Sequence, residues 1–287
     1  MKYAWIDKHR DLFTVTRMCR VLAVSRSGYC QWRTRAPSDR ARSNAALDAE
    51  VAALHAASRS TYGRPRIVRD LHQQGVRVGH ERVRRSLKRQ GLRTVYKRPY
   101  RVTTDSNHDK PIAANVLDRR FTGWQLNQAW VGDITYVATG EGWLYLACVM
   151  DLASRKIVGW SMSDRMKAGL VCDALTMAYW QRKPAAGLIA HTDRGSQYAS
   201  TAYRKLLNDF RMVQSMSRRA NCWDNAVAES FFKTLKVERV DRQRYASRAQ
   251  ARLDIVDWIE GSYNRSRRHS SIGYQTPVGK ELGFKAA

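Results

Sequence analysis

Three β-rich segments joined only by short turns occupy the middle of the chain, at 129–139, 142–152 and 156–162. Strands with connections this short pair as antiparallel neighbours. Helical and β-rich patterns then alternate, with a helix at 168–182, a strand at 187–193, a helix at 200–209, a strand at 212–217 and a helix at 226–238. This order predicts an α/β domain in which helices cover both faces of a mixed sheet.

The part of the chain before this sheet predicts helices alone. Residues 14–32 read as two short helices with Ser25 capping the second, a pattern that fits a helix-turn-helix and a plain helical hairpin equally well. Residues 35–42 read as a linker, and a further helix is expected at 45–58.

A second helix-turn-helix candidate lies at 62–92. Pro65 suits the start of its first helix, and Gly91 suits the end of its second, which is expected at about 80–90. That second helix carries Arg82, Arg85 and Arg89. Such a face is either simply solvated or binds DNA, and the charge of the whole chain favours DNA.

The chain is strongly basic, with a formal net charge of +26 and a pI of about 10.4. Residues 1–120 hold 27 Lys and Arg against 10 Asp and Glu. This excess favours a polyanionic partner, because basic side chains release counterions from phosphates. The first part of the chain is therefore expected to grip DNA, and the rest to form an enzyme body.

The five cysteines show no zinc-ligand spacing with a histidine, which indicates reduced thiols in a cytosolic protein. The first residues are charged, and no apolar run approaches about 18 residues. Neither a signal peptide nor a membrane span is expected.

Three carboxylates stand out from this pattern. Asp133 interrupts a strand otherwise rich in β-branched and aromatic residues, and Asp193 lies at the carboxyl end of a buried strand, where α/β sheets bind ligands. Glu229 lies on a helix face away from the apolar stripe. The two aspartates meet if the first and fourth strands are neighbours, and the later helix can bring Glu229 beside them.

Three carboxylates that converge repel one another unless a cation lies between them. Oxygen ligands without Cys or His select Mg²⁺ or Mn²⁺, and two such ions can flank a phosphate during in-line transfer. Alternatives remain open at this point. Glu229 alone reads as an ordinary surface partner of Lys233, Asp151 is a rival acid that reads as a turn residue, and His191 reads as structural.

The spacing of the acids resembles a known pattern. Asp193 and Glu229 are separated by 35 residues, as in the D,D,35,E arrangement of retroviral integrases and bacterial DDE transposases, and Lys236 follows seven residues after the glutamate. Four stretches are similar to the B-frame product of the large insertion-sequence family that makes its transposase by frameshifting. They are WVGDITYVATGEGWLYLACVMDLASRKIVGW, HTDRGSQYAS, SRRANCWDNAVAESFFKTLKVE and YNRSRRHSSIGYQTP.

The resemblance implies an RNase H-like core in which Asp133, Asp193 and Glu229 bind two Mg²⁺ ions, with Mn²⁺ as a substitute. It implies that water nicks double-stranded DNA at the ends of the element and that the freed 3′-hydroxyl attacks a target phosphodiester. It also implies contacts with DNA near the cut end from Lys236 and Asn225, and contacts with the DNA backbone from Arg265, Arg268 and His269.

The resemblance further implies an A-frame partner product, an oligomer on DNA and a cytoplasmic, nucleoid-associated protein. The chain is divided into a helical segment at 1–42, a helix-turn-helix domain at 43–103, a linker at 104–126, an RNase H-like integrase core at 127–240 and a carboxyl-terminal helix with a basic tail at 241–287. Two other functions remain open, a non-catalytic or regulatory DNA-binding protein that needs a fused partner, and an RNase H-like nuclease.

Overall fold

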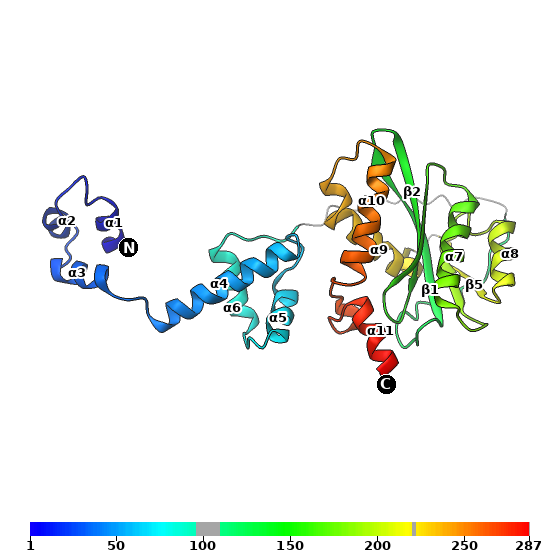
Figure 1. The fold of residues 1–287 in the computed structure, drawn as a ribbon, viewed down its shortest axis with the longest axis horizontal. Coiled ribbons are helices and arrows are strands. Elements are labelled where there is room, and N and C mark those ends of the chain that lie inside the picture. The colour runs from blue at the N-terminus through cyan, green and yellow to red at the C-terminus, as the bar shows by residue number, and fades with distance from the viewer. Residues whose placement is uncertain (96–109, 220–221, 287) are drawn as a thin grey trace. The chain divides into compact units, whose positions relative to one another are not determined.

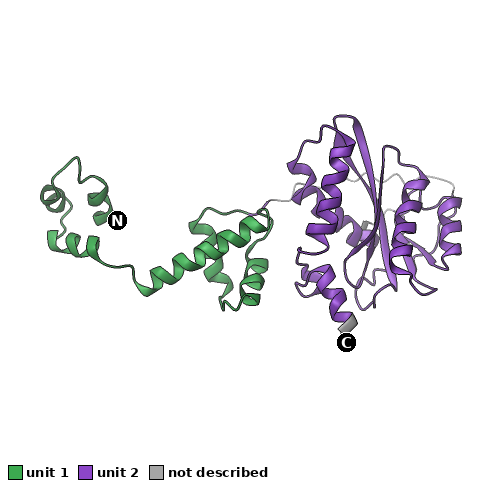
Figure 2. Ribbon diagram, in the orientation of Figure 1, with its two compact units in different colours: residues 1–93 green, residues 94–287 purple. Residues whose placement is uncertain are grey.

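The computed structural model describes residues 1–95, 110–219 and 222–286. The chain forms two compact units, residues 1–93 and residues 94–287 (Figure 2). The predicted end of the helix-turn-helix domain at 103 and the start of the linker at 104 lie outside the described residues.

The first unit begins with three short helices, α1 (Lys2–Lys8), α2 (Val15–Val21) and α3 (Arg26–Thr34). Ser25 caps α3 as predicted, since its Oγ accepts a hydrogen bond from the backbone N–H of Gly28 at 3.0 Å. A small core of Ile6, Met18, Cys19 and Tyr29 holds the three helices together. The sequence did not predict α1, whose only fully buried residue is Ile6.

Three further helices follow, α4 (Asp39–Ala57), α5 (Arg64–Gln73) and α6 (His80–Arg89). Pro65 lies in the first turn of α5 as predicted, and Gly91 follows α6 with a positive φ of 65°. The interpretation of 35–42 as a linker is wrong in its second half, because Ser38 caps a helix that begins at Asp39. Its Oγ accepts a hydrogen bond from the N–H of Ala41.

The second unit is built on a five-stranded mixed sheet. Its strands are β1 (Ala129–Thr139), β2 (Gly142–Asp151), β3 (Ile157–Ser163), β4 (Ile189–Thr192) and β5 (Val213–Met216), in the order β3-β2-β1-β4-β5. The first three are antiparallel neighbours, and β4 pairs in parallel with both β1 and β5. The predicted mixed sheet is confirmed, and the pairing of β1 with β4 meets the condition under which Asp133 and Asp193 come together.

Helices cover both faces of this sheet, as Figure 1 shows. On one face, α7 (Ala168–Arg182) and α8 (Thr201–Asp209) enclose a core that includes Trp130, Val149 and Leu175. On the other, α9 (Ala226–Glu238) and α10 (Arg248–Asp257) pack over Val131, Leu146 and Met150. Alternate residues of β1 and β2 thus contribute to two separate cores.

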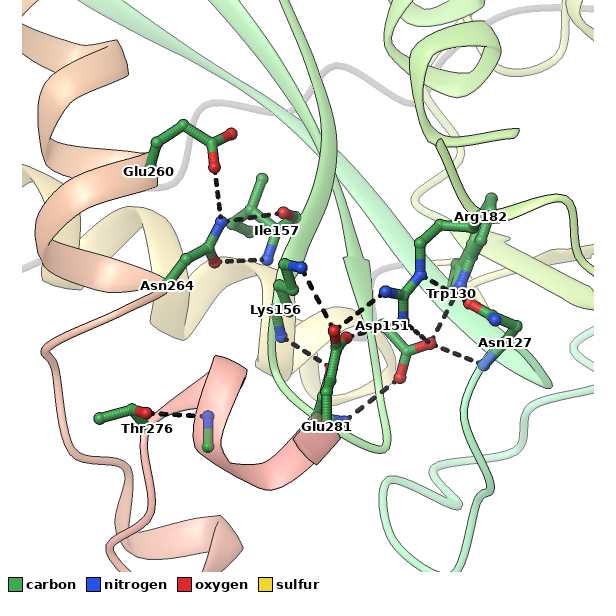
Figure 3. Close-up of polar contacts among 12 residues, drawn as sticks. Asn127, Trp130, Asp151, Lys156, Ile157, Arg182, Glu260, Asn264, Thr276 and Glu281 are labelled. Carbon is green, nitrogen blue, oxygen red and sulfur yellow. Dashed lines mark hydrogen bonds and ion pairs between the residues drawn. The ribbon is translucent and has the colours of Figure 1, made fainter. Parts of the chain in front are cut away.

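The chain after α10 is more ordered than the basic tail that the sequence predicted. A π-helical turn (Trp258–Tyr263) continues α10, and a further helix, α11 (Pro277–Ala286), follows. The side chain of Asn264 donates to the carbonyl of Ile157 and accepts from its N–H, which ties this region to the edge strand β3 (Figure 3). The prediction failed because α11 is short and is held by Glu281, a charged residue with no visible partner in the sequence.

Residues 110–126 contain neither helix nor strand, as expected for that stretch. They nevertheless pack on the second unit, since Leu117 is fully buried in its core and the N–H groups of Val116 and Leu117 donate to Ser215 Oγ. No helix in the described ranges is long and apolar enough to cross a membrane.

Candidate active site

Asp133 lies on the central strand β1, opposite Cys148 of β2. One carboxylate oxygen accepts a hydrogen bond from the N–H of Ile134 at 2.8 Å. Burial, and then the negative charges of Asp193 and Glu229, raise the pKa of Asp133 well above its usual range, against the effect of this hydrogen bond. The carboxylate is therefore held where its charge is opposed by its neighbours.

Asp193 follows directly after β4. The parallel register aligns Val131 with His191. Asp133 and Asp193 each follow this aligned pair by two residues. The carboxylate of Asp193 accepts a hydrogen bond from the N–H of Gly195 at 2.9 Å. A Cβ at position 195 would lie only 3.0 Å from that carboxylate oxygen, so glycine permits the close turn.

Glu229 lies in the first turn of α9, whose buried residues include Ala228, Phe231 and Leu235. Its side chain is partly buried. Burial and the charge of Asp193 raise the pKa of Glu229. The charge that shifts the pKa of Glu229 is thus that of another acid. This favours a functional role for Glu229 over that of an ordinary surface partner of Lys233.

The three acids come from distant parts of the chain, yet their charges act on one another. Among the described residues, however, no three Asp, Glu, His or Cys side chains lie close enough together to hold a metal ion as they stand. The chemistry of the donors suits a hard divalent cation. An ion held by all three carboxylates would require at least one of them to change its position.

Lys236 lies two turns beyond Glu229 on the same helix. Its Nζ lies 4.7 Å from the ring centroid of Tyr136 on β1, which is a cation–π contact. Burial lowers the pKa of Lys236, while the charges of Asp241 and Asp133 act to raise it. The ammonium group is therefore held near the acidic residues rather than on an open helix face.

Two other residues were singled out in the sequence, Asn225 and His191. The position of Asn225 does not fit its predicted role, whereas that of His191 does. Asn225, predicted to contact DNA, is only 4% exposed, so this prediction is not supported by its position. His191 is fully buried, with ring nitrogens 2.9 Å from Ser215 Oγ and 3.3 Å from Ser217 Oγ, and burial lowers its pKa to about 4. A neutral, hydrogen-bonded ring of this kind is structural, as expected.

The rival acid Asp151 is also structural. It is fully buried and accepts hydrogen bonds from the N–H groups of Asn127 at 2.7 Å and Ala153 at 2.8 Å, and from Trp130 Nε1 at 3.2 Å (Figure 3). These donors fix the turn after β2, which is the role that the sequence indicated.

The predicted DNA-binding arginines of α6 all have partners within the first unit. Arg82 Nη2 donates to Ser43 Oγ at 2.6 Å, Arg85 pairs with Glu81 at 3.2 Å, and Arg89 pairs with Asp48 at 2.6 Å. Arg82, Arg85 and Arg89 remain exposed, and with Arg40 they line a groove between α4 and α6. Exposed ion pairs of this kind exchange readily for phosphate.

The second unit holds the remaining predicted DNA contacts. Arg265 is exposed, Arg268 donates to the carbonyl of Tyr274 at 3.0 Å, and the ring of His269 packs edge-on against Tyr263. Sequence reasoning missed two buried residues, Tyr198 and Asp224. Tyr198 is buried, and burial with the charges of Asp133 and Asp193 raises its pKa well above its usual range. Asp224, a loop acid with no distinctive pattern around it, is fully buried.

Comparison with known proteins agrees with this geometry. Residues 125–222 and 211–277 match families described as integrase core domains, and residues 41–100 match an HTH-like domain. The catalytic core domain of HTLV-2 integrase in complex with magnesium is 15% identical, covers 55% of this chain and 97% of that chain, and gives a TM-score of 0.43. That structural similarity is too low to support a conclusion.

Two curated relatives match almost end to end. The chain is 45% identical over 280 residues to "Transposase InsF for insertion sequence IS3A" of Escherichia coli strain K12, covering 96% of this chain and 97% of the relative. It is 45% identical over 261 residues to "Insertion element IS600 uncharacterized 31 kDa protein" of Shigella sonnei, covering 91% and 96%.

A mixed-sheet integrase core preceded by a helix-turn-helix-like region defines a class of DNA recombinases, the transposases and integrases of the DDE type. Within this class, the chain belongs to the insertion-sequence transposases of the retroviral-integrase superfamily, in the group that contains InsF of IS3.

Proposed function

We propose that Asp133, Asp193 and Glu229 are the catalytic carboxylates of this DNA transposase. The observation that carries the proposal is the parallel pairing of β1 with β4, which places Asp133 and Asp193 at the same end of neighbouring strands. Burial and like charge also raise the pKa of Asp133 and Glu229. Structural acids are normally paired with cations, whereas acids kept near one another are typical of a metal-dependent site.

The donor set fits Mg²⁺, with Mn²⁺ as a substitute, since it offers carboxylate oxygens alone. Asp133, Asp193 and Glu229 would hold two ions when DNA is bound. The ions would supply charge neutralisation on both sides of a phosphate and a more acidic attacking oxygen. No soft ligand is needed for this chemistry.

The proposed reaction has two steps at the same carboxylates. Water first cleaves a phosphodiester at an end of the element and leaves a 3′-hydroxyl. That hydroxyl then attacks a phosphodiester of target DNA, so that one bond forms as another breaks. The protein would orient the reacting oxygens in line, and the bound ions would favour the ionised form of the three carboxylates.

Lys236 is suited to bind a phosphate beside the cut end, because its ammonium group is held between Tyr136 and the acids. Binding along the duplex is assigned to Arg82, Arg85 and Arg89 in the first unit and to Arg265, Arg268 and His269 in the second. For Arg85 and Arg89, phosphate would replace the carboxylates of Glu81 and Asp48.

The substrates are double-stranded DNA ends of the element and double-stranded target DNA. Joining two ends to a target needs more than one catalytic core, so an oligomer on DNA is part of the proposal, as is an A-frame partner product. The protein would act in the bacterial cytoplasm at the nucleoid. The domain boundaries at 42, 103, 126 and 240 also remain proposals, and the first lies within α4.

The test is strand transfer on labelled DNA that carries the ends of the element, with the wild type, Glu229→Gln and Asp173→Asn side by side. Asp173 is an exposed acid on α7 and serves as the matched control. Products that require Mg²⁺ or Mn²⁺ and vanish only in Glu229→Gln are expected. Equal activity of Glu229→Gln and the wild type would overturn the site assignment.

A further inference from the structure

The turn that leads into the catalytic helix is fixed by a buried acid. Asp224 is fully buried in a short 3₁₀ turn, η1 (Cys222–Asn225), directly before α9. It accepts hydrogen bonds from Arg119 Nε at 2.7 Å, from Asn115 Nδ2 at 2.9 Å, and from the backbone N–H, Nε and Nη2 of Arg218, each at 2.9 Å. The hydrogen bonds from Arg218 hold the pKa of Asp224 well below its usual range.

These donors come from segments that are distant in sequence. Asn115 and Arg119 belong to the stretch before β1, and Arg218 follows β5. Five hydrogen bonds to one carboxylate leave little freedom for η1 to rotate, because any rotation would leave a buried charge without its partners. The residue next to Asp224 therefore has a fixed position relative to the start of α9.

That neighbour is Trp223, whose side chain is 68% exposed. Trp130 at 1% and Trp258 at 3% are buried in the cores of this unit, whereas Trp143 at 49% and Trp180 at 63% are also exposed. Scattered exposed apolar residues are normal, but this indole belongs to a turn whose next residue is locked by ion pairs. An exposed aromatic ring on a restrained backbone is suited to bind a flat partner, since little backbone entropy is lost on contact.

The turn that carries Trp223 is also close in sequence to Glu229. Glu229 follows Trp223 by six residues of 3₁₀ and α-helix, which places the two backbone positions about 10 Å apart. Successive nucleotides of a strand rise by about 3.4 Å, so this distance corresponds to a few nucleotides. The ion-pair cluster around Asp224 is balanced in charge, because Arg218 also pairs with Asp118 at 3.1 Å. Stacking rather than charge is thus what the ring can offer.

We infer that Trp223 stacks on a base of the DNA strand within a few nucleotides of the cut end, and that Asp224 positions it. This inference rests on the proposed function, because it takes DNA as the ligand and Glu229 as part of the catalytic site. Stacking on an aromatic side chain tolerates every base. Its role would be to hold an unpaired end in place while the 3′-hydroxyl is aligned.

The test uses the full chain and a DNA end that carries 2-aminopurine, whose fluorescence is quenched by stacking, at successive positions near the cut. Wild type is expected to quench at one of these positions. Trp223→Ala is expected to lose that quenching and to bind the end roughly 5- to 100-fold more weakly, the range typical of one lost stacking contact. Trp223→Tyr is expected to restore most of both effects.

Trp180→Ala is the matched control, since Trp180 is 63% exposed at the end of α7. It comes before β4, and Asp193 follows the opposite end of that strand. Equal quenching and affinity in the wild type and Trp223→Ala would overturn the inference. A change in oligomeric state with quenching intact would also overturn it, and would assign the ring to contact between copies of the chain. If Trp223→Ala melts early, loss of quenching in Trp223→Leu with quenching kept in Trp223→Tyr still supports stacking.

The inference and the proposed function fail in different ways. Wild type that quenches but makes no strand-transfer product would contradict the proposed reaction and leave the stacking contact in place. If the wild type transfers strands but its quenching of 2-aminopurine is unchanged in Trp223→Ala, the stacking contact alone is contradicted.

Discussion

Two acidic groups lie around the same sheet and differ in what surrounds them. Burial and the charges of neighbouring acids raise the pKa of Asp133 and of Glu229, with Asp193 among those acids. Asp151 and Glu281, near the end of β2, are surrounded by donors and cations (Figure 3). The strand β1 contributes to both, through Asp133 and through the indole N–H of Trp130.

The carboxylates of the second group are bound by several donors. Glu281 receives Arg182 Nη1 and Nη2 at 3.0 and 2.7 Å, Lys156 Nζ at 3.2 Å and Ser154 Oγ at 3.0 Å. Burial alone would raise the pKa of Glu281, but the hydrogen bonds and charge of Arg182 bring it below its usual range. The group thereby fastens α11 to α7 and to the turn between β2 and β3.

The difference separates acids that stabilise the fold from acids available for chemistry. Removal of Glu281 leaves buried cations without their partner, whereas removal of one acid from the first group relieves repulsion. Charge removal should therefore have opposite effects on stability in the two groups. Four predictions test this contrast, and the largest expected effect comes first.

Asp193→Asn is expected to lower strand transfer by at least about a thousandfold, because one carboxylate of a metal-dependent site is lost. Its thermal stability should equal or exceed that of the wild type, since a like charge beside Asp133 is removed. The measurements are strand transfer on labelled ends and thermal melting. Asp173→Asn should leave both unchanged, and a marked loss of stability in Asp193→Asn would contradict the contrast.

Glu281→Ala is expected to lower the free energy of unfolding of the second unit by roughly 2–4 kcal/mol, because Arg182 and Lys156 lose a buried partner. Denaturant unfolding measures this change. Strand transfer well below the melting temperature should persist. Glu50→Ala, at an exposed acid of α4, is the control, and equal unfolding curves for the two variants would show that the cluster is not stabilising.

Asp224→Asn is expected to reduce the dependence of stability on acid pH. The pKa of Asp224 is lowered in the folded protein, so its contribution is present above the ordinary carboxyl pKa and is lost as the pH falls below it. At pH 7 the variant should be less stable by about 1–3 kcal/mol. The difference in melting temperature between wild type and variant should narrow from pH 6 toward pH 3, and a constant difference would contradict this account.

Lys236→Met is expected to weaken binding of DNA ends by only a few-fold and to reduce the salt slope of binding by about one, as for one lost phosphate contact. Methionine keeps the apolar contact with Tyr136. Lys233→Met on the same helix is the matched control. Identical salt slopes for Lys236→Met and the wild type would remove Lys236 from the proposed contacts.

The sequence predicted most of the fold because its patterns are local. Short turns set the antiparallel meander, and the apolar runs set β4 and β5. The neighbouring positions of Asp133 and Asp193 followed from the pairing of β1 with β4, which the structure confirms. Glu229 was placed with them by its interval from Asp193, and its role stays a prediction.

What could not be predicted depends on contacts between distant residues. The helix α11 is fastened by Glu281 to Arg182, which lies 99 positions earlier. Asp224 meets Arg119 across 105 positions, and no local pattern marks either acid as buried. Asn225 shares a helix start with the exposed Trp223, yet it is buried, because the ion pairs of Asp224 set the orientation of the whole turn.

The sheet order also has a consequence for the timing of synthesis. The central strand carries the first acid, its parallel neighbour leads to the second, and the third follows on α9, so that Glu229 leaves the ribosome 96 residues after Asp133. At usual elongation rates this interval lasts roughly 5–20 s. During that time the helical unit of residues 1–93 is already made. A growing chain can therefore meet DNA before it possesses all three of the acids that are proposed to cut it.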